Sequence, residues 1–223
     1  EQFYVGMSAV IEKKWLTSSS FALEIALPSV GEEAAFYAAV PRSRARLFEK
    51  NLQSLYPSAK AEEKKEDYNI FHHVGGHAAA YLTLAENPVL PIRTYQRLDY
   101  DPLEIIANAF SKLKKEGEGA TIQIILSHSP KKFKNILKSS IKAIREGKKI
   151  KSSKISLGES LTFLITGKSG DGTKKEGAII DEETLKLVEE KVSFPNLWAN
   201  IRLVASAQTQ EEAEMIVREL SSS

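Results

Sequence analysis

The sequence predicts an α+β fold in which antiparallel strands form a sheet that carries helices on one face. One observation is a strong helix start, with Asp101 as the N-cap acceptor and Pro102 at the first helical position. Another is the apolar, β-branched run over residues 120–127, typical of a strand buried on both faces. A third is the succession strand–strand–helix–strand, which occurs over residues 21–71 and again over 78–127. This duplication of pattern predicts ferredoxin-like, split βαβ units.

The helix that starts at Pro102 has one apolar face, and we expect this face to pack on the sheet. Lysines cluster where the helix should end, and Gly117 with Gly119 is predicted to stop it. Phe110 and Ile124 are expected to be buried where this helix meets the sheet. The apolar face consists of Leu103, Ile106, Ala107, Phe110 and Leu113.

The first unit begins with clean alternation over residues 21–27, which predicts a half-buried strand. Residues 34–40 are predicted to return as its partner strand. A helix follows from Pro41 to Pro57, and the charged segment 59–71 is interpreted as an edge strand.

The second unit begins with a predicted strand over residues 78–85. Residues 90–95 are predicted to be its partner, and Pro91 favours a position at the edge of the sheet.

Outside these units, residues 1–16 have a single apolar stripe, which predicts a docking helix rather than a membrane-surface helix. The C-terminal part contains a helix at 131–145, a basic loop at 147–177, an acidic helix at 181–191 and a strand at 198–207. Thr209 and Glu212 form a capping-box pattern before the last helix. Three regions result, namely residues 1–20 (docking helix and linker), 21–130 (core) and 131–223, which completes the α+β region.

Composition excludes several classes of function. The chain has 31 Lys and Arg against 29 Asp and Glu, so its overall charge indicates no polyanionic partner. It has no cysteine, which rules out disulfides, thiolate catalysis and cysteine-ligated metal centres. No stretch has the length of a membrane span or the pattern of a signal peptide. Because the chain begins with Glu1, we expect it to be a fragment of a longer protein.

A nucleotide-binding loop is suggested by Gly167-Lys168-Ser169, but the motif is incomplete. A phosphate-binding loop needs a glycine where this chain has Thr162, and a helix after the lysine, where Gly170 and Gly172 follow instead. The segment is therefore interpreted as a flexible loop.

A metal site is suggested by His72, His73 and His77, since three imidazoles can hold zinc. We favour three loop histidines, because no acidic residue completes a ligand motif and the surrounding glycines give poor rigid support. His128 has no serine or base partner in the pattern. The sequence thus predicts no catalytic residue, no metal and no cofactor.

Basic residues are concentrated between positions 131 and 154, where Glu146 is the one acid. The favoured interpretation is a solvated helix face with a basic loop. The alternative is a non-specific, salt-sensitive surface for nucleic-acid phosphates, without aromatic residues for base stacking. Its candidate residues are Lys131, Lys132, Lys134, Lys138, Lys142, Arg145, Lys148 and Lys149.

Four segments together resemble a known family. They read FALEIALPSVGEEAAFYAAVPR (21–42), DYNIFHHVGGHAAAYLTL (67–84), PIRTYQRLDYDPLEIIANAFSKLKKEGEGATIQIIL (91–126) and NIRLVASAQTQEEAEMIVREL (200–220). They resemble the region that precedes the motor in bacterial type IV secretion and conjugative DNA-transfer ATPases, related to the HerA–FtsK class. The resemblance is most specific at residues 116–120 and in the strand NIRLVASA, and it weakens over 148–180.

This resemblance implies a non-catalytic accessory domain that positions or oligomerises a membrane-associated translocation ATPase. It implies a downstream ATPase domain in the same chain, an upstream membrane anchor, a homo-oligomer, and a place in the cytoplasm at the inner face of the cell membrane. No Walker lysine exists here, so the family's catalytic residues match no position of this sequence. The alternative is a direct nucleic-acid-binding module that uses residues 131–154, and a stand-alone enzyme comes third.

Overall fold

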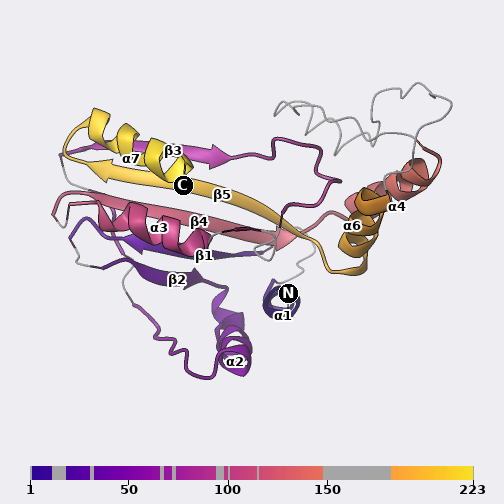
Figure 1. Cartoon of the computed structure of the whole chain (residues 1–223). Coiled ribbons are helices and arrows are strands. Elements are labelled where there is room, and N and C mark those ends of the chain that lie inside the picture. The colour runs from indigo at the N-terminus through magenta and orange to yellow at the C-terminus, as the bar shows by residue number, and fades with distance from the viewer. Residues whose placement is uncertain are drawn as a thin grey trace. The chain divides into compact units, whose positions relative to one another are not determined.

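The computed structural model shows an α+β chain with one five-stranded antiparallel sheet in the order β2-β1-β4-β5-β3 (Figure 1). It describes residues 2–11, 19–30, 33–65, 68–71, 74–93, 98–99, 101–114, 116–147 and 182–222. The chain divides into two compact units. Unit 1 comprises residues 1–82, 94–128 and 199–223, and unit 2 comprises 83–93 and 129–198.

Strands are present, with shifted ends, near five of the predicted ranges, namely 21–27, 34–40, 78–85, 120–127 and 198–207. In the β1–β4 pair, Ile25 lies opposite Ile122 and Leu27 opposite Ala120. In the β3–β5 pair, Ala78 lies opposite Ala205. Apolar residues of neighbouring strands thus share one face of the sheet. The strands are β1 (Ser20–Leu27), β2 (Ala35–Ala39), β3 (Gly76–Leu82), β4 (Gly119–His128) and β5 (Leu197–Ala207).

Helices α3 (Pro102–Ser111) and α7 (Gln210–Ser222) cover this apolar face (Figure 1). Phe110 from α3 is 3% exposed, and α7 packs along β3. The expected arrangement of helices on one face of an antiparallel sheet is therefore confirmed. The buried core consists of Leu27, Ala109, Phe110, Ala120, Ile122, Leu203, Ala205, Ala207, Ala213, Ile216, Val217 and Leu220.

The predicted cap of α3 is confirmed, because the Leu103 backbone N–H donates to Asp101 Oδ1 at 2.9 Å. The end and the face of the helix differ from expectation. The helix stops at Ser111, and Gly117 lies in a later turn with φ 86°, a conformation that favours glycine. Leu103 is 51% exposed, and Ala107 is exposed as well. The buried face of the helix is rotated away from these two residues and carries Ala109 and Phe110.

Two further expectations concern burial in the same region. Ile124 is only half-buried, although Phe110 is fully buried as expected. On α3, Ala109 takes the inward position that the pattern assigned to Ala107.

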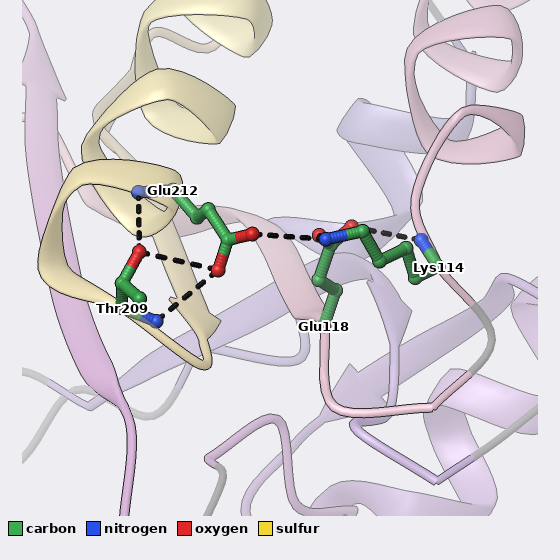
Figure 2. A network of polar contacts seen from close by, with 4 residues as sticks. All are labelled: Lys114, Glu118, Thr209 and Glu212. Carbon is green, nitrogen blue, oxygen red and sulfur yellow. Dashed lines mark hydrogen bonds and ion pairs between the residues drawn. The ribbon is translucent and has the colours of Figure 1, made fainter.

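A polar network joins the end of α3 to the start of α7 (Figure 2). Thr209 and Glu212 form the predicted capping box, with the Glu212 N–H donating to Thr209 Oγ1 and the Thr209 N–H donating to Glu212 Oε2, each at 3.2 Å. Lys114 Nζ lies 2.9 Å from Glu212 Oε1 and 3.1 Å from Glu118 Oε1. The Lys114 backbone N–H also donates to Glu118 Oε2. One lysine therefore connects two segments that are about a hundred residues apart in sequence.

The prediction of an edge strand at 59–71 is wrong for the described residues 59–65 and 68–71, which contain no strand. Residues 68–71 instead lie over the face of the sheet opposite α3 and α7. The Asn69 carbonyl accepts the Ser29 N–H at 3.0 Å, and Ile70 is buried. A Cβ on Gly119 would come within 2.3 Å of the Ile70 oxygen, so glycine permits this close approach.

Unit 1 also contains two helices outside the sheet, α1 (Gln2–Met7) and α2 (Ala45–Leu55), which pack against each other. Residues Arg42–Arg44 form one turn of 3₁₀ helix (η1), and α2 follows with Phe48 buried. Helix α1 contacts α2 where Asn51 Nδ2 donates to the Gly6 carbonyl at 3.1 Å. The predicted N-terminal docking helix is thus shorter than expected within the described residues 2–11, and it docks on its own unit.

Unit 2 contains α4 (Lys131–Arg145) and α6 (Glu182–Ser193), which pack on each other. Their apolar faces bury Phe133, Leu137, Ile144 and Val188 together with Val89. The predicted partner strand at 90–95 is wrong for residues 90–93, which form no strand. The Leu90 N–H instead donates to the Asn87 carbonyl and forms a turn. Lys191 Nζ donates to the Leu90 carbonyl. The predicted basic loop lies almost entirely outside the described residues.

The duplication of strand–strand–helix–strand is not confirmed. Strands β3 and β4 lie on either side of β5 in the sheet, and α3 lies between them in sequence. In the predicted first unit, over residues 21–71, helix α2 is followed by residues 68–71, which lie across the face of the sheet and add no strand to it. Among the described helices, none is long and apolar enough to cross a membrane.

Candidate functional site

The basic residues of the predicted phosphate-contacting surface lie along α4 in unit 2. Spacings of four, four and three residues place Lys134, Lys138, Lys142 and Arg145 on one side of this helix, because an α-helix turns once every 3.6 residues. All four are exposed, whereas Phe133, Leu137 and Ile144 on the other side are buried. We call these four residues the basic stripe.

The other residues of the predicted surface add less to it. Lys132 is exposed but points away from the stripe by its position on the helical wheel. The side chain of Lys131, and Lys148 and Lys149 entirely, lie outside the described part of the structure. The structure therefore assembles four of the eight predicted residues into one surface.

Acidic helix α6 reduces the charge of the stripe at its C-terminal end. Arg145 Nη2 lies 2.7 Å from Glu189 Oε1, and both side chains are partly exposed. Surface ion pairs of this kind add at most about 1 kcal/mol to stability, yet they neutralise one of the four charges. Three lysines thus remain as the unpaired part of the stripe within the described residues.

Lys191, also on α6, has a structural role. Its Nζ donates to the carbonyls of Pro88 at 2.7 Å and Leu90 at 3.0 Å, and it lies 5.9 Å from the centre of the Phe133 ring. Burial lowers the pKa of Lys191 below its usual value. The lysine therefore holds the 87–90 turn against the helix pair.

The histidine cluster is only partly described, because His72 and His73 lie outside the described residues. His77 on β3 contacts Ser206 Oγ through Nδ1 at 3.1 Å, and the Phe71 ring meets it edge-on. Within the described residues, no group of three or more histidines, cysteines and acids is placed to hold a metal ion. His128 contacts the Ile11 carbonyl through Nε2 at 3.3 Å.

The glycine-rich segment around Gly167 lies outside the described residues, so its interpretation as a loop stays a prediction.

A second cluster, which the sequence did not reveal, lies on the sheet face opposite α3 and α7. Tyr68 donates a hydrogen bond to the Glu24 carboxylate, and Gln123 Nε2 donates to the same carboxylate at 3.2 Å. The Tyr68 hydroxyl also lies 3.2 Å from Thr121 Oγ1, and its ring stacks against Tyr37. Strand β1 contributes Glu24, β2 contributes Tyr37 and β4 contributes Thr121 and Gln123, and we call this group with Tyr68 the tyrosine cluster.

Burial, followed by the hydrogen bond to Glu24, raises the pKa of Tyr68 to about 12. The hydroxyl therefore stays protonated at physiological pH and acts as a hydrogen-bond donor. These hydrogen bonds anchor residues 68–71 on the sheet. The one sequence signal for it is Glu24, a charged residue within an otherwise apolar strand.

We call residues 68–71 the strap, because they lie across the sheet and are anchored there by Tyr68. Together these features define a class of protein: an α+β sheet unit with an anchored strap, and a second, two-helix unit that presents a basic stripe. The chain belongs to the family described as Domain of unknown function (DUF8128), which matches residues 3–223. No curated protein and no solved structure matches the chain.

Proposed function

We propose that this chain is a non-catalytic accessory domain of a membrane-associated, type IV secretion-like conjugative ATPase, and that it positions or oligomerises the motor. The observation that carries the proposal is where the four family-like segments lie. Apart from residues 83–84 and 91–93, all four belong to unit 1, although they are spread over some 200 residues of sequence.

These segments depend on one another structurally. The 21–42 segment supplies β1 and β2, and β1 pairs with β4 from the 91–126 segment. The 67–84 segment supplies Tyr68 and β3, which pairs with β5 from the 200–220 segment. Lys114 and Glu212 connect the third and fourth segments directly. The resemblance therefore concerns segments that pair and pack with one another in one folded unit, not a single local motif.

The proposal assigns partners as the resemblance implies them: an ATPase domain downstream in the same polypeptide, a membrane anchor upstream, and further copies of the same protein. It places the domain in the cytoplasm at the inner face of the cell membrane. The chain itself contributes assembly and positioning, and nucleotide hydrolysis belongs to the motor.

The complete reading frame gives the first test, since the proposal expects a Walker loop within about one domain's length after residue 223. The second test compares the full-length protein with a deletion of residues 21–220. The deletion is expected to keep nucleotide binding by the motor and to lose assembly, measured by sedimentation. A reading frame without a Walker loop would contradict the proposal.

The alternative function is non-specific binding of duplex nucleic acid, and the basic stripe is the observation that favours it. Each lysine that contacts a phosphate releases about one counterion, so changing all four stripe residues to glutamine should flatten the salt dependence of binding by about three to four units. A matched control changes four exposed lysines of unit 1 to glutamine, namely Lys50, Lys60, Lys65 and Lys112. Fluorescence anisotropy at several salt concentrations makes the comparison. Equal binding by both variants would exclude the stripe as the contact surface.

A further inference from the structure

Strand β2 forms one edge of the sheet, and it lacks the features that usually protect an edge. It pairs with β1 on one side only. Its sequence, AFYAA, contains neither a charged residue nor a proline. Natural edge strands usually carry lysine, proline or a bulge, which prevent pairing with another chain. Within the described part of the chain, the backbone hydrogen bonds of β2 are those it makes with β1.

The side chains of β2 are also unusually exposed. Phe36 is 77% exposed, although it lies opposite Ile25 on the face that α3 and α7 cover elsewhere. Ala35, Ala38 and Ala39 are exposed as well, and their small side chains leave the backbone accessible to a second strand. A strand that offers unpaired amide groups beside an exposed phenylalanine is a site for β-strand addition.

The residues that flank β2 carry opposite charges. Glu33 lies two residues before the strand, and Arg42 lies three residues after it. Both are exposed, and neither has an ion-pair partner among the described residues. If the strand is paired antiparallel with itself, the acidic end of each copy comes beside the basic end of the other. The flanks are therefore complementary to a second copy of the same chain.

We propose that β2 pairs antiparallel with β2 of a second copy of this chain, about a two-fold axis near Tyr37. In this arrangement Phe36 lies opposite Ala38 of the partner copy. The two Phe36 rings are diagonal neighbours about 7–8 Å apart at the backbone, within reach of aromatic side chains. A five-residue strand pair buries little surface, so the isolated chain forms a weak dimer.

This inference identifies the surface through which the chain oligomerises. The pairing itself is argued from the structure, and only its biological role rests on the proposed function. Strand β3, the opposite edge, is also uncharged, but the matching pair of flanking charges belongs to β2. The two-fold arrangement and a head-to-tail arrangement of β2 on β3 give different outcomes when variants are mixed, as described below.

The first experiment measures self-association of the whole chain by sedimentation equilibrium, from about 10 μM to about 1 mM, a range suited to small interfaces. We expect a reversible dimer, and Phe36→Lys should raise its dissociation constant at least about tenfold, because a lysine protects a strand edge. Circular dichroism checks that the variant folds. A chain that stays monomeric at all concentrations would overturn the proposal, as would an unaffected dimer in Phe36→Lys.

The second experiment uses charge reversal at two exposed side chains outside the strand, and circular dichroism checks that both variants fold. E33R and R42E should each weaken the dimer about three- to tenfold, because each places like charges at both ends of the pair. An equimolar mixture of the two variants should recover the affinity of the wild type, because both ends then carry opposite charges. Glu49→Arg and Lys60→Glu, at exposed positions elsewhere, serve as matched controls without effect.

A mixture that fails to recover affinity would exclude the two-fold pairing and would indicate a head-to-tail contact. Failure of this inference is distinguishable from failure of the proposed function. Sedimentation of the variants decides the pairing surface alone, whereas the reading frame and the deletion of residues 21–220 decide the link to a motor.

Discussion

The two faces of the sheet in unit 1 are built on different principles, although the same strands supply both. On β1, Ile25 faces the helices and its neighbour Glu24 faces the other way. On β4, Ile122 faces the helices and Thr121 faces the tyrosine cluster. Because side chains alternate along a strand, each strand contributes to a dry core and to a polar cluster at once.

The difference shows how each face is stabilised. The helix-covered face depends on buried apolar area, which contributes roughly 25 cal/mol for each Å² and tolerates changes of similar volume. The strap-covered face depends on a few directional hydrogen bonds and on one close backbone approach at Gly119. Substitutions on the two faces should therefore differ in size and in their dependence on pH.

The largest effect is expected on the helix-covered face. Phe110→Ala should lower the free energy of unfolding by about 3–5 kcal/mol, because it leaves a cavity between α3 and the sheet. Leu103→Ala on the same helix is the matched control, since Leu103 is half exposed, and it should cost less than about 0.5 kcal/mol. Denaturant unfolding measures both. Equal losses would mean that the buried face of α3 is wrongly assigned.

The next effect is expected where the strap meets β4. Gly119→Ala introduces a Cβ that would lie 2.3 Å from the Ile70 carbonyl oxygen, so backbone must move. Overpacking of this kind costs about 1–3 kcal/mol. Gly6→Ala is the control, because its nearest neighbour would be the Asn51 side chain at 3.5 Å, an ordinary contact. Similar stabilities for both variants would show that residues 68–71 can leave the sheet without cost.

The tyrosine cluster gives a somewhat smaller and pH-dependent effect. Tyr68→Phe should cost about 1–2 kcal/mol near neutral pH, because the Glu24 carboxylate loses one donor but keeps Gln123. Tyr56→Phe, at an exposed tyrosine, is the control. No difference between the two variants would show that the Tyr68 hydroxyl does not anchor the strap.

The sign of the pH dependence follows from the raised pKa of Tyr68, about 12 in the folded chain against about 10 in the unfolded chain. The folded state favours the neutral phenol, so its contribution is present below pH 10 and is lost as the pH rises towards 12. An ultraviolet titration should show a tyrosine that ionises late, and Tyr68→Phe should remove that late step.

Much of the helix-covered face could be predicted from the sequence. Its residues recur with periods of 2 and 3.6, and periodicity reports which side of an element is apolar. The capping signals at Asp101 and Thr209 are equally local, and both give the expected hydrogen bonds. Alternation alone, however, could not tell a strand from the segment at 59–71.

The strap-covered face could not be predicted, because its partners lie far apart in sequence. Tyr68 is 44 residues from Glu24 and 53 from Thr121. Whether a tyrosine reaches a carboxylate depends on the strand register, which sequence spacing does not give. The basic stripe is an intermediate case. Helical spacing places its members correctly, but the loss of charge at Arg145 depends on the packing of α6.

The smallest effect is expected at the network of Figure 2, which lies at the surface beside the covered face. Hydrogen bonding to Lys114, followed by that to Thr209, lowers the pKa of Glu212, whereas the pKa of Lys114 is raised, first by Glu212. A carboxyl whose pKa is lowered on folding contributes stability above its unfolded pKa, about 4.3, and loses it as the pH falls through the folded value. Lys114 stays charged throughout this acidic range.

Lys114→Met should therefore destabilise the chain slightly at pH 7, and the difference from wild type should shrink as acid protonates the Glu212 carboxylate. Denaturant midpoints for wild type and variant across this range make the measurement. Lys112→Met, at an exposed lysine two residues earlier, is the control and should show no pH-dependent difference. A loss that is equal at pH 7 and pH 3 would assign the effect of Lys114 to its aliphatic stem. A loss that shrinks with acid would show that the ion pair between Lys114 and Glu212 stabilises the contact between the end of α3 and the start of α7. The apolar core beneath this contact would then contribute to stability independently of the ion pair.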